Sequence, residues 1–350
     1  MAERPRWRLL RDGITDPFLH FAVEEAILRG VDEGTSPETL RLRQVEPSVF
    51  IGIYQEPDDE VDLTFCEERA IKIVRRQNPG GAVYQDRGSF CYSATFLRSR
   101  LERWGLQDPS GLYEKAGRAV VGVCARFGAS ARARPVNDVE IDGRKVYGSA
   151  QIDWYDAFVH SGSFLVNTDI DAMAGALRPS PIKFADKAKG SIRERVVTLS
   201  EAAGRVIPVG DAMAALTSEL GRELDVDLQP GELNERELAS AKRLFDSKYG
   251  RKEWTFRARE SFSTVLSAKA RSGVVTIEAD LRGGAIERLQ VRGDFLIAGQ
   301  RHLEALVARL RGVQVQEAPG IVARAALPED VRDTICRLLH ETGASSRKEG

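Results

Sequence analysis

The sequence lacks most of the features that would place it in a specialised class of protein. It contains four scattered cysteines, with no CxxC pair and none of the cysteine and histidine spacings of a zinc site. No apolar run approaches the roughly 18 residues of a membrane span, and the opening MAERPRWRLL has no apolar signal-peptide core. We therefore expect a cytoplasmic protein with free thiols and no membrane partner.

An excess of one charge is also missing. The net charge is −1, from 51 Lys and Arg against 52 Asp and Glu, and no long basic block stands out. Such a chain has no overall field that would attract nucleic acid, so we expect no nucleic-acid partner. The 350 residues, 42% of them hydrophobic, suffice for two domains with buried cores.

Helix and strand patterns alternate through the first two thirds of the chain. Apolar residues recur at helical spacing over 17–30 and 111–127, and β-rich runs cover 39–45, 48–54, 70–76 and 160–169. Asp142-Gly143 lies between two further β-rich runs, which predicts a tight hairpin within 136–151. We also expect Asp211 to cap a helix that runs to Leu220.

The composition changes over residues 229–253, a charged and helical stretch that we interpret as a connector. A hairpin around Gly283-Gly284 and helices near 302–312 and 327–340 follow it, which together can close a small core of their own. We predict a larger domain over 1–250 and a small C-terminal α/β domain over 251–350. Because every candidate ligand contact precedes residue 200, we expect the small domain to assist rather than to carry the chemistry.

The densest candidate site is the run from Arg75 to Tyr84, RRQNPGGAVY. Glycines let backbone amides approach a phosphate closely, and an adjacent arginine can pair with phosphate through two hydrogen bonds. The run matches neither the phosphate-binding loop of nucleoside triphosphatases nor a dinucleotide fingerprint. The alternative is an ordinary hairpin turn with surface arginines.

Two further clusters follow. Lys145 comes directly after the Asp142-Gly143 turn, with Asn137-Asp138 before it and small residues behind, so it could stabilise charge on an attacked acyl phosphate. His160 and a group of lysines that includes Lys187 form the second cluster. The alternatives are an exposed hairpin lysine, a structural strand histidine and a solvated charge run.

In their order and separation, these motifs resemble the lipoate–protein ligase branch of the biotin/lipoate ligase superfamily. The segments that carry the resemblance are PSVFIGIYQEP, RRQNPGGAVYQDRGSFCYS, NDVEIDGRKVYGSAQ and HSGSFLVNTD, and the resemblance extends over nearly the whole chain. It implies an α/β (α+β) fold, with a mixed-sheet catalytic domain and a smaller C-terminal α/β accessory domain.

The resemblance also implies a function. Lipoate would be activated with ATP and Mg2+ to lipoyl-AMP and transferred to a lysine of a lipoyl-domain acceptor, such as a 2-oxoacid dehydrogenase E2, a glycine cleavage H protein or a lipoate-binding protein. Lys145 would be the catalytic residue and Asp138 the metal ligand. The ATP site would comprise Arg76, Gly81, Ala82, Val83, Tyr84, Lys145 and Lys187, and the lipoate site Lys145, Gly80, Asn137 and His160.

Two positions depart from the family pattern, and two other functions stay open. Pro79 replaces the first glycine of the turn and removes an amide donor, and Gln85 replaces a histidine and cannot carry its charge. A degenerate, non-catalytic lipoate-binding paralogue is therefore one alternative. The other is an octanoyl- or lipoyl-transferase with a cysteine nucleophile, although RARPVNDVEI, where that branch has its cysteine, contains none.

Overall fold

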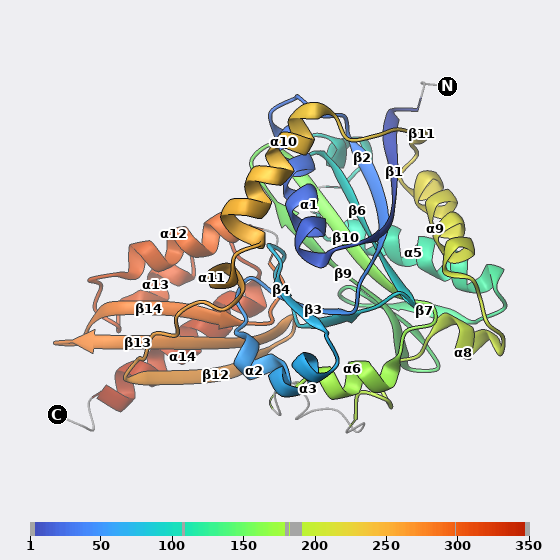
Figure 1. Cartoon of the computed structure of the whole chain (residues 1–350). Helices are drawn as coiled ribbons and strands as arrows, with labels where there is room; N and C mark the ends of the chain where they lie inside the picture. Colours follow the sequence, from blue (N-terminus) through green and yellow to red (C-terminus); the bar gives the residue numbers. More distant parts are fainter. Residues whose placement is uncertain (1–3, 107–108, 179–181, 183–190, 298, 347–350) are drawn as a thin grey trace.

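The computed structural model describes residues 4–106, 109–178, 182, 191–297 and 299–346. Two units lie side by side: a large one that runs from the N-terminus to α11, and a smaller one from β12 to α14 (Figure 1). Within the described ranges, none of the helices combines the length and apolar character that crossing a bilayer would need.

A mixed sheet of eight described strands forms the centre of the large unit. The strand order is β11-β1-β2-β6-β10-β9-β8-β7, with β1 parallel to β2 and β11 and the remaining pairs antiparallel. The strands are β1 (Arg6–Thr15), β2 (Thr39–Val45), β6 (Ser89–Leu97), β7 (Ala131–Arg134), β8 (Asp138–Ile141), β9 (Arg144–Asp153), β10 (Ala157–Leu165) and β11 (Asp227–Pro230). This confirms the predicted α/β fold with a mixed sheet.

Helices cover both faces of this sheet. Helices α5 (Gly111–Arg126) and α9 (Val209–Glu223) share one apolar core with Leu40 and Leu42 of β2. Helices α1 (Pro17–Asp32) and α10 (Glu235–Leu244) pack on the opposite face, where β2 presents Arg41 and Arg43 to α1. Because side chains of a strand alternate between faces, β2 has one apolar face and one face of buried arginines.

A smaller three-stranded sheet carries the glycine turn. Strand β3 (Ser48–Ile51) pairs in parallel with β4 (Lys72–Arg75) and antiparallel with β5 (Val83–Gln85), so the turn at 76–82 connects the two outer strands. The other short helices among the described residues of this unit are α2 (Pro57–Glu60), α3 (Leu63–Glu68), α4 (Arg100–Arg103), α6 (Ile170–Ala176) and α8 (Leu199–Ala203).

The C-terminal unit has a core of its own. Strands β12 (Thr264–Ala270), β13 (Gly273–Arg282) and β14 (Ala285–Gly293) form an antiparallel sheet, and the helices are α12 (Gln300–Leu310), α13 (Ala318–Val322) and α14 (Glu329–Ser346). The predicted hairpin at Gly283-Gly284 is confirmed, with φ of 58° and 79° that glycine tolerates. The exact domain boundary stays a prediction.

The predicted connector is helical, but it belongs to the large unit. It comprises α10, the π-helix η1 (Phe245–Tyr249) and α11 (Lys252–Thr255), and its Tyr249 lies in the same core as Phe21 of α1. Several of its charged groups point inward to partners: Glu237 pairs with Arg8, and Lys248 with Glu25. The charge of this segment reflects buried ion pairs as well as a solvated surface.

The prediction that Asp211 caps its helix is wrong. Helix α9 begins at Val209, with Pro208 as its N-cap, and Asp211 lies inside the first turn. The proline side chain has no hydrogen-bonding group, and α9 begins without a side-chain cap. Asp211 still favours this end of the helix through its charge.

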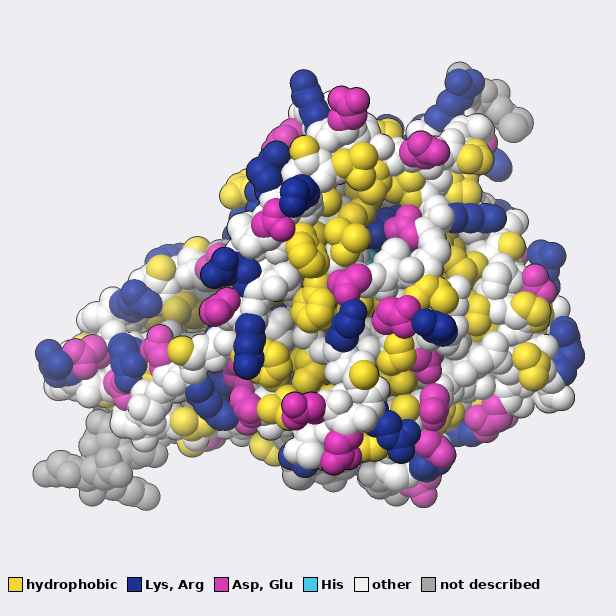
Figure 2. Space-filling view, viewed as in Figure 1, with side chains coloured by type: hydrophobic (Ala, Val, Ile, Leu, Met, Phe, Trp, Pro, Cys, Tyr) yellow, Lys and Arg dark blue, Asp and Glu magenta, His cyan; other side chains and the backbone are white. Residues whose placement is uncertain are grey.

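Charges of both signs are mixed over the surface. On the face shown in Figure 2, basic and acidic side chains are interspersed, and hydrophobic side chains gather near the middle. This mixture is what the balanced composition leads one to expect.

The ion pair between Arg8 and Glu237 joins β1 to α10 and gives a stability prediction. Two bonds of 2.5 and 2.7 Å connect the two buried side chains. Glu237→Gln preserves the shape of the side chain, an oxygen for the Asn234 amide and the backbone amide that Asn234 caps. We expect it to lower the free energy of unfolding by about 3 kcal/mol, because it leaves Arg8 buried without a counter-charge. Urea unfolding at pH 7 measures the loss.

The pH dependence provides the control. Burial alone would raise the pKa of Glu237, but the hydrogen bonds from Arg8 and its other donors outweigh burial and hold that pKa below its usual 4.5. The stabilisation is therefore complete above pH 4.5, and it is lost as the pH falls through the pKa of Glu237 in the folded state, which lies below 4.5. A difference between the two proteins that stays constant down to strongly acid pH would contradict this account.

Candidate functional site

The glycine turn is held from beneath by Arg76. Its guanidinium donates hydrogen bonds to the backbone oxygens of Phe50 at 2.7 Å, Pro79 at 3.1 Å and Gly81 at 2.7 Å. Gly80 has a φ of 96°, and a side chain at Gly52 would meet the Gly80 oxygen at 2.1 Å. Arg76 therefore first of all shapes the turn, which sequence reasoning did not anticipate.

Arg76 is also a buried cation: among the described residues no carboxylate forms a direct ion pair with it, although the charge of Glu24 favours its protonated form. Burial lowers its pKa to about 10, so it keeps its charge at neutral pH. Because Arg76 lines a cavity, an anion bound there would add to the charge compensation from Glu24. Direct contact with a triphosphate stays a prediction.

Gln77 links the turn to both ends of the chain. Its side-chain amide donates to Glu25 of α1, whose carboxylate also accepts bonds of 2.7 Å from Lys248 and from Tyr249 of η1. Burial would raise the pKa of Glu25, but Lys248 and the hydrogen bonds outweigh it and lower that pKa. The backbone oxygen of Gln77 accepts a bond from Gln300 of α12. The position of the turn thus depends on the C-terminal third of the chain.

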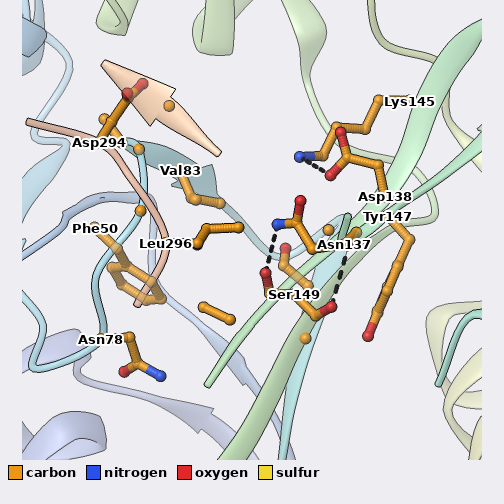
Figure 3. A pocket seen from close by; sticks show the side chains of 18 of the residues that line it. Phe50, Asn78, Val83, Asn137, Asp138, Lys145, Tyr147, Ser149, Asp294 and Leu296 are labelled. Carbon is orange, nitrogen blue, oxygen red and sulfur yellow. Dashed lines mark hydrogen bonds and ion pairs between the residues drawn. The ribbon is translucent and has the colours of Figure 1, made fainter. Parts of the chain in front are cut away.

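The β8–β9 hairpin supplies the second wall. Asp142 and Gly143 have φ of 50° and 71°, the tight turn expected from the sequence. Lys145 Nζ lies 2.6 Å from Asp138 Oδ1 (Figure 3). The backbone of Lys145 is bonded on its other side to Arg195 and Val197, at 2.7 and 3.0 Å. The backbone of Lys145 is therefore fixed on both sides, while its ammonium group, on a side chain that is 42% exposed, is paired with Asp138.

Asn137 lies on the same wall and is largely occupied by the backbone. Its Nδ2 donates to the Ser149 oxygen at 2.6 Å, and the Ser149 amide donates back to the Asn137 oxygen at 3.0 Å (Figure 3). This pairing fixes the bend before Asp138, which then points at Lys145. Asn137 lines the cavity and is half-buried.

Both walls open onto one cavity of about 820 Å³. Arg76, Gly80, Gly81, Ala82, Val83, Tyr84, Asn137, Asp138 and Lys145 all line it, so the structure brings together residues predicted from two separate motifs. Lys187 lies outside the described residues. Cations exceed carboxylates in the described lining: Arg43, Arg76, Arg132, Arg134, Lys145, Arg195, Lys269 and Arg271 against Glu24, Glu60, Asp138, Glu140 and Asp294. Such a lining suits an anionic ligand.

His160 does not line this cavity, which corrects its placement as a lipoate contact. Strand alternation directs Ser161 to Glu24 at 2.8 Å, while His160 faces the other side of the sheet between Tyr92 and Tyr113. Burial lowers the pKa of His160 to about 3, so the ring is neutral. It is a core histidine.

The C-terminal unit also contributes to the lining. Arg271 and Ser272 form the two-residue tip between β12 and β13, and the segment 269–274 lines the cavity together with Asp294 and Leu296. Leu296 packs against the glycine turn, within 3.0 Å of where a Gly80 side chain would begin. The expectation that all candidate contacts precede residue 200 is therefore wrong for the cavity, and no local sequence signal marks this hairpin tip.

A metal would find few protein ligands here. Within the described part of the chain, no cluster of three or more His, Cys, Asp or Glu side chains could hold an ion. Asp138 is one of the carboxylates that line the cavity, which fits magnesium because that ion commonly uses one or two carboxylates and the phosphates of its substrate.

Comparison with known proteins gives one consistent answer. Residues 16–221 match the family model described as the lipoyl protein ligase A/B catalytic domain. The structure is similar to a bi-partite lipoate protein ligase from Thermoplasma acidophilum, described with its E2 lipoyl domain, at 28% identity and a TM-score of 0.64 over 74% of this chain and 99% of that one.

Two further solved structures are similar. A lipoate-protein ligase A bound with ATP is 26% identical, with a TM-score of 0.61 over 72% of this chain and 98% of that one. LipL1 of P. falciparum, in complex with lipoate, is 17% identical, with a TM-score of 0.73 over 95% of this chain and 98% of that one. The last likeness concerns the fold alone, and it includes the small C-terminal unit.

The close approach of Gly52 to Gly80 gives a test of the turn. We expect Gly52→Ala to fold but to lower the reaction rate with ATP by about 10²-fold, because a shift of about 1 Å in the turn misplaces its amides. Activity with ATP and thermal unfolding are measured together. Gly13→Ala is the matched control, since a side chain there meets nothing within 4 Å. Unchanged activity in Gly52→Ala would show that the turn does not position the nucleotide.

Proposed function

The chain belongs to the lipoyl protein ligase A/B catalytic-domain family, and we propose from this premise how its cavity performs the reaction. The protein is an ATP-dependent lipoate–protein ligase, which activates lipoate as lipoyl-AMP and transfers the lipoyl group to a lysine of a lipoyl-domain acceptor. The observation that carries the site assignment is the joint position of the Arg76 turn and Lys145 on two walls of one cation-rich cavity.

In the first step, a carboxylate oxygen of lipoate attacks the α-phosphorus of ATP, and pyrophosphate leaves. Residues Gly80, Gly81, Ala82, Val83 and Tyr84 line the nucleotide side of the cavity, where backbone amides can meet phosphate oxygens. Lys145 offsets the charge that develops on the α-phosphate, and Asp138 holds the ammonium group ready at 2.6 Å. The product is a mixed anhydride, lipoyl-AMP.

In the second step, the ε-amine of the acceptor lysine attacks the lipoyl carbonyl, an amide bond forms and AMP leaves. Lys145 stabilises the oxyanion and the departing phosphate. No enzyme nucleophile is required, because the anhydride is already activated. Lys145 is the catalytic residue of this proposal.

Asp138 would hold magnesium. When bound, the ion supplies neutralisation of phosphate charge. The acceptor is a lipoyl domain, as in the archaeal system described with its E2 partner. We place the reaction in the cytoplasm, in keeping with four cysteines that are all free.

None of the four cysteines has the lowered pKa that the transferase alternative requires. Burial raises the pKa of Cys66 to about 11, of Cys91 to about 11 and of Cys124 to about 12. Burial also raises the pKa of Cys336. All four are therefore protonated at neutral pH, whereas a nucleophilic cysteine needs a lowered pKa.

The departures at Pro79 and Gln85 leave the cavity intact. The oxygen of Pro79 still accepts its bond from Arg76, and the buried Gln85 is occupied by Tyr84, Ser89 and Cys91. A non-catalytic paralogue would bind lipoate and ATP but release no pyrophosphate. Calorimetry paired with a pyrophosphate assay separates the two.

The direct test of function is mass spectrometry of a lipoyl domain incubated with the protein, lipoate and Mg-ATP. We expect one lipoyl group on the acceptor lysine. We expect Lys145→Met to fold normally and to lower both adenylation and transfer by about 10²-fold or more, because it removes one electrostatic stabiliser of the transition state. Lys242→Met, on an exposed face of α10, is the matched control and should retain full activity. Full activity in Lys145→Met would remove Lys145 from the mechanism.

Cysteine substitution separates ligase from transferase. We expect Cys91→Ser, the one cysteine that lines the cavity, to retain ATP-dependent lipoylation, because the mechanism uses no thiol. Acyl transfer from acyl carrier protein without ATP should not occur. An acyl-enzyme detected on Cys91 by mass spectrometry, together with loss of activity in a folded Cys91→Ser, would replace the ligase by a transferase.

A further inference from the structure

The inner end of the cavity, across from Lys145, has an aromatic wall. The rings of Phe21 and Phe50 lie 4.7 Å apart between centroids, and His20 stacks on Phe50 at 5.6 Å. Burial, together with Arg43 and Arg41, lowers the pKa of His20 well below 6.5, so the ring is neutral. All three residues line the cavity. This end suits the apolar tail of an acyl group rather than its carboxylate.

The charges behind this wall are already satisfied. Arg43 donates to Glu24 at 2.9 Å and to Ser93 at 3.0 Å, and its other contacts go to His20 and the Arg41 oxygen. The second oxygen of Glu24 accepts a bond from Ser161 at 2.8 Å. The ion pair supports the wall, but it is committed to protein partners.

Asn78 is different. Its side chain is 3% exposed, it lines the cavity, and its Nδ2 has no hydrogen-bond partner in the described structure. Two other cavity-lining atoms of the described residues lack a hydrogen bond: Asp138 Oδ1, which has the Lys145 ammonium as its ion-pair partner, and Ser272 Oγ at the β12–β13 tip. Figure 3 shows Asn78 beside Phe50, on the side of the cavity opposite Lys145. A buried amide donor without an acceptor is costly, which points to a ligand that supplies the acceptor.

The backbone keeps this amide in place. The Asn78 oxygen accepts a bond of 3.2 Å from the Ile53 amide, and Pro79 restricts the conformation of the residue before it. Gln77, on the other side, is bonded to Glu25. Pro79, which departs from the family pattern, therefore helps to fix the direction of Asn78.

We propose that Asn78 recognises the distal end of the acyl substrate, by donating a hydrogen bond from Nδ2 to a ring sulfur of lipoate. This inference rests on the proposed function, which places the carboxyl end of the substrate at Lys145. Divalent sulfur accepts weak hydrogen bonds, whereas the methyl end of octanoate accepts none and leaves the amide unpaired. Asn78 is thus a specificity-determining residue that favours the dithiolane over a plain alkyl chain.

The test compares lipoate and octanoate as substrates of the full-length protein, as the ratio of their kcat/KM values in the presence of Mg-ATP and a lipoyl domain. The wild type favours lipoate. Asn78→Leu, which preserves volume but removes the donor, shifts the ratio toward octanoate by about tenfold, the size expected for one weak polar contact. Asn78→Ala, which only opens space, shifts it no further than Asn78→Leu does.

Asn167→Leu is the matched control, because its amide lies outside the cavity and bonds to the Ile207 oxygen. Thermal unfolding shows which variants are folded, and Asn78→Val gives a second variant without a donor if the leucine does not fold. A wild-type ratio in folded Asn78→Leu or Asn78→Val, or a larger shift in Asn78→Ala than in Asn78→Leu, overturns the inference and leaves the ligase function standing. Failure of the wild type to ligate either acid overturns the proposed function itself.

Discussion

The site depends on one buried guanidinium. Arg76 donates to three backbone oxygens, on β3 and on both sides of the glycine turn, and so converts a flexible sequence into a fixed loop. Without these bonds the carbonyls of the turn would be free to rotate into the cavity. Because burial leaves the pKa of Arg76 at about 10, the group stays charged, and this charge, which the Glu24 carboxylate offsets without a direct ion pair, favours anions in the cavity.

Residues of both the large and the small unit line the cavity. Tyr249 and Lys248 bind Glu25, which holds Gln77, while Trp254 and Thr255 accept bonds from Arg75 just before the turn. From the small unit, the β12–β13 tip and Leu296 complete the lining. The C-terminal third therefore shapes a site whose motifs all lie earlier in the chain, which is a physical reason for a ligase to carry an accessory domain.

The two departures from the family pattern act on shape rather than on reaction class. Gln85 is a buried amide that joins Tyr84, Ser89 and Cys91 and thereby ties β5 to β6. Pro79 constrains Asn78 at the aromatic end of the cavity. Neither change removes Lys145 or Asp138, so the groups assigned to adenylation and transfer are present.

By itself, the sequence determined what depends on neighbouring residues: the long helices, the Asp142-Gly143 and Gly283-Gly284 hairpins, the glycine turn, and the ordered motifs that indicate a lipoate ligase. It could not show that Arg76 lies beneath the turn, that His160 faces away from the cavity, or that Asn78 and Arg271 face it. The physical reason is distance along the chain. Helical periodicity and turn dipeptides act within a few residues, whereas the face that a strand turns to a cavity, and the docking of β12–β13 against a turn almost 200 positions earlier, follow from the packing of whole layers. Only the tertiary structure decided which of the candidate residues share one cavity.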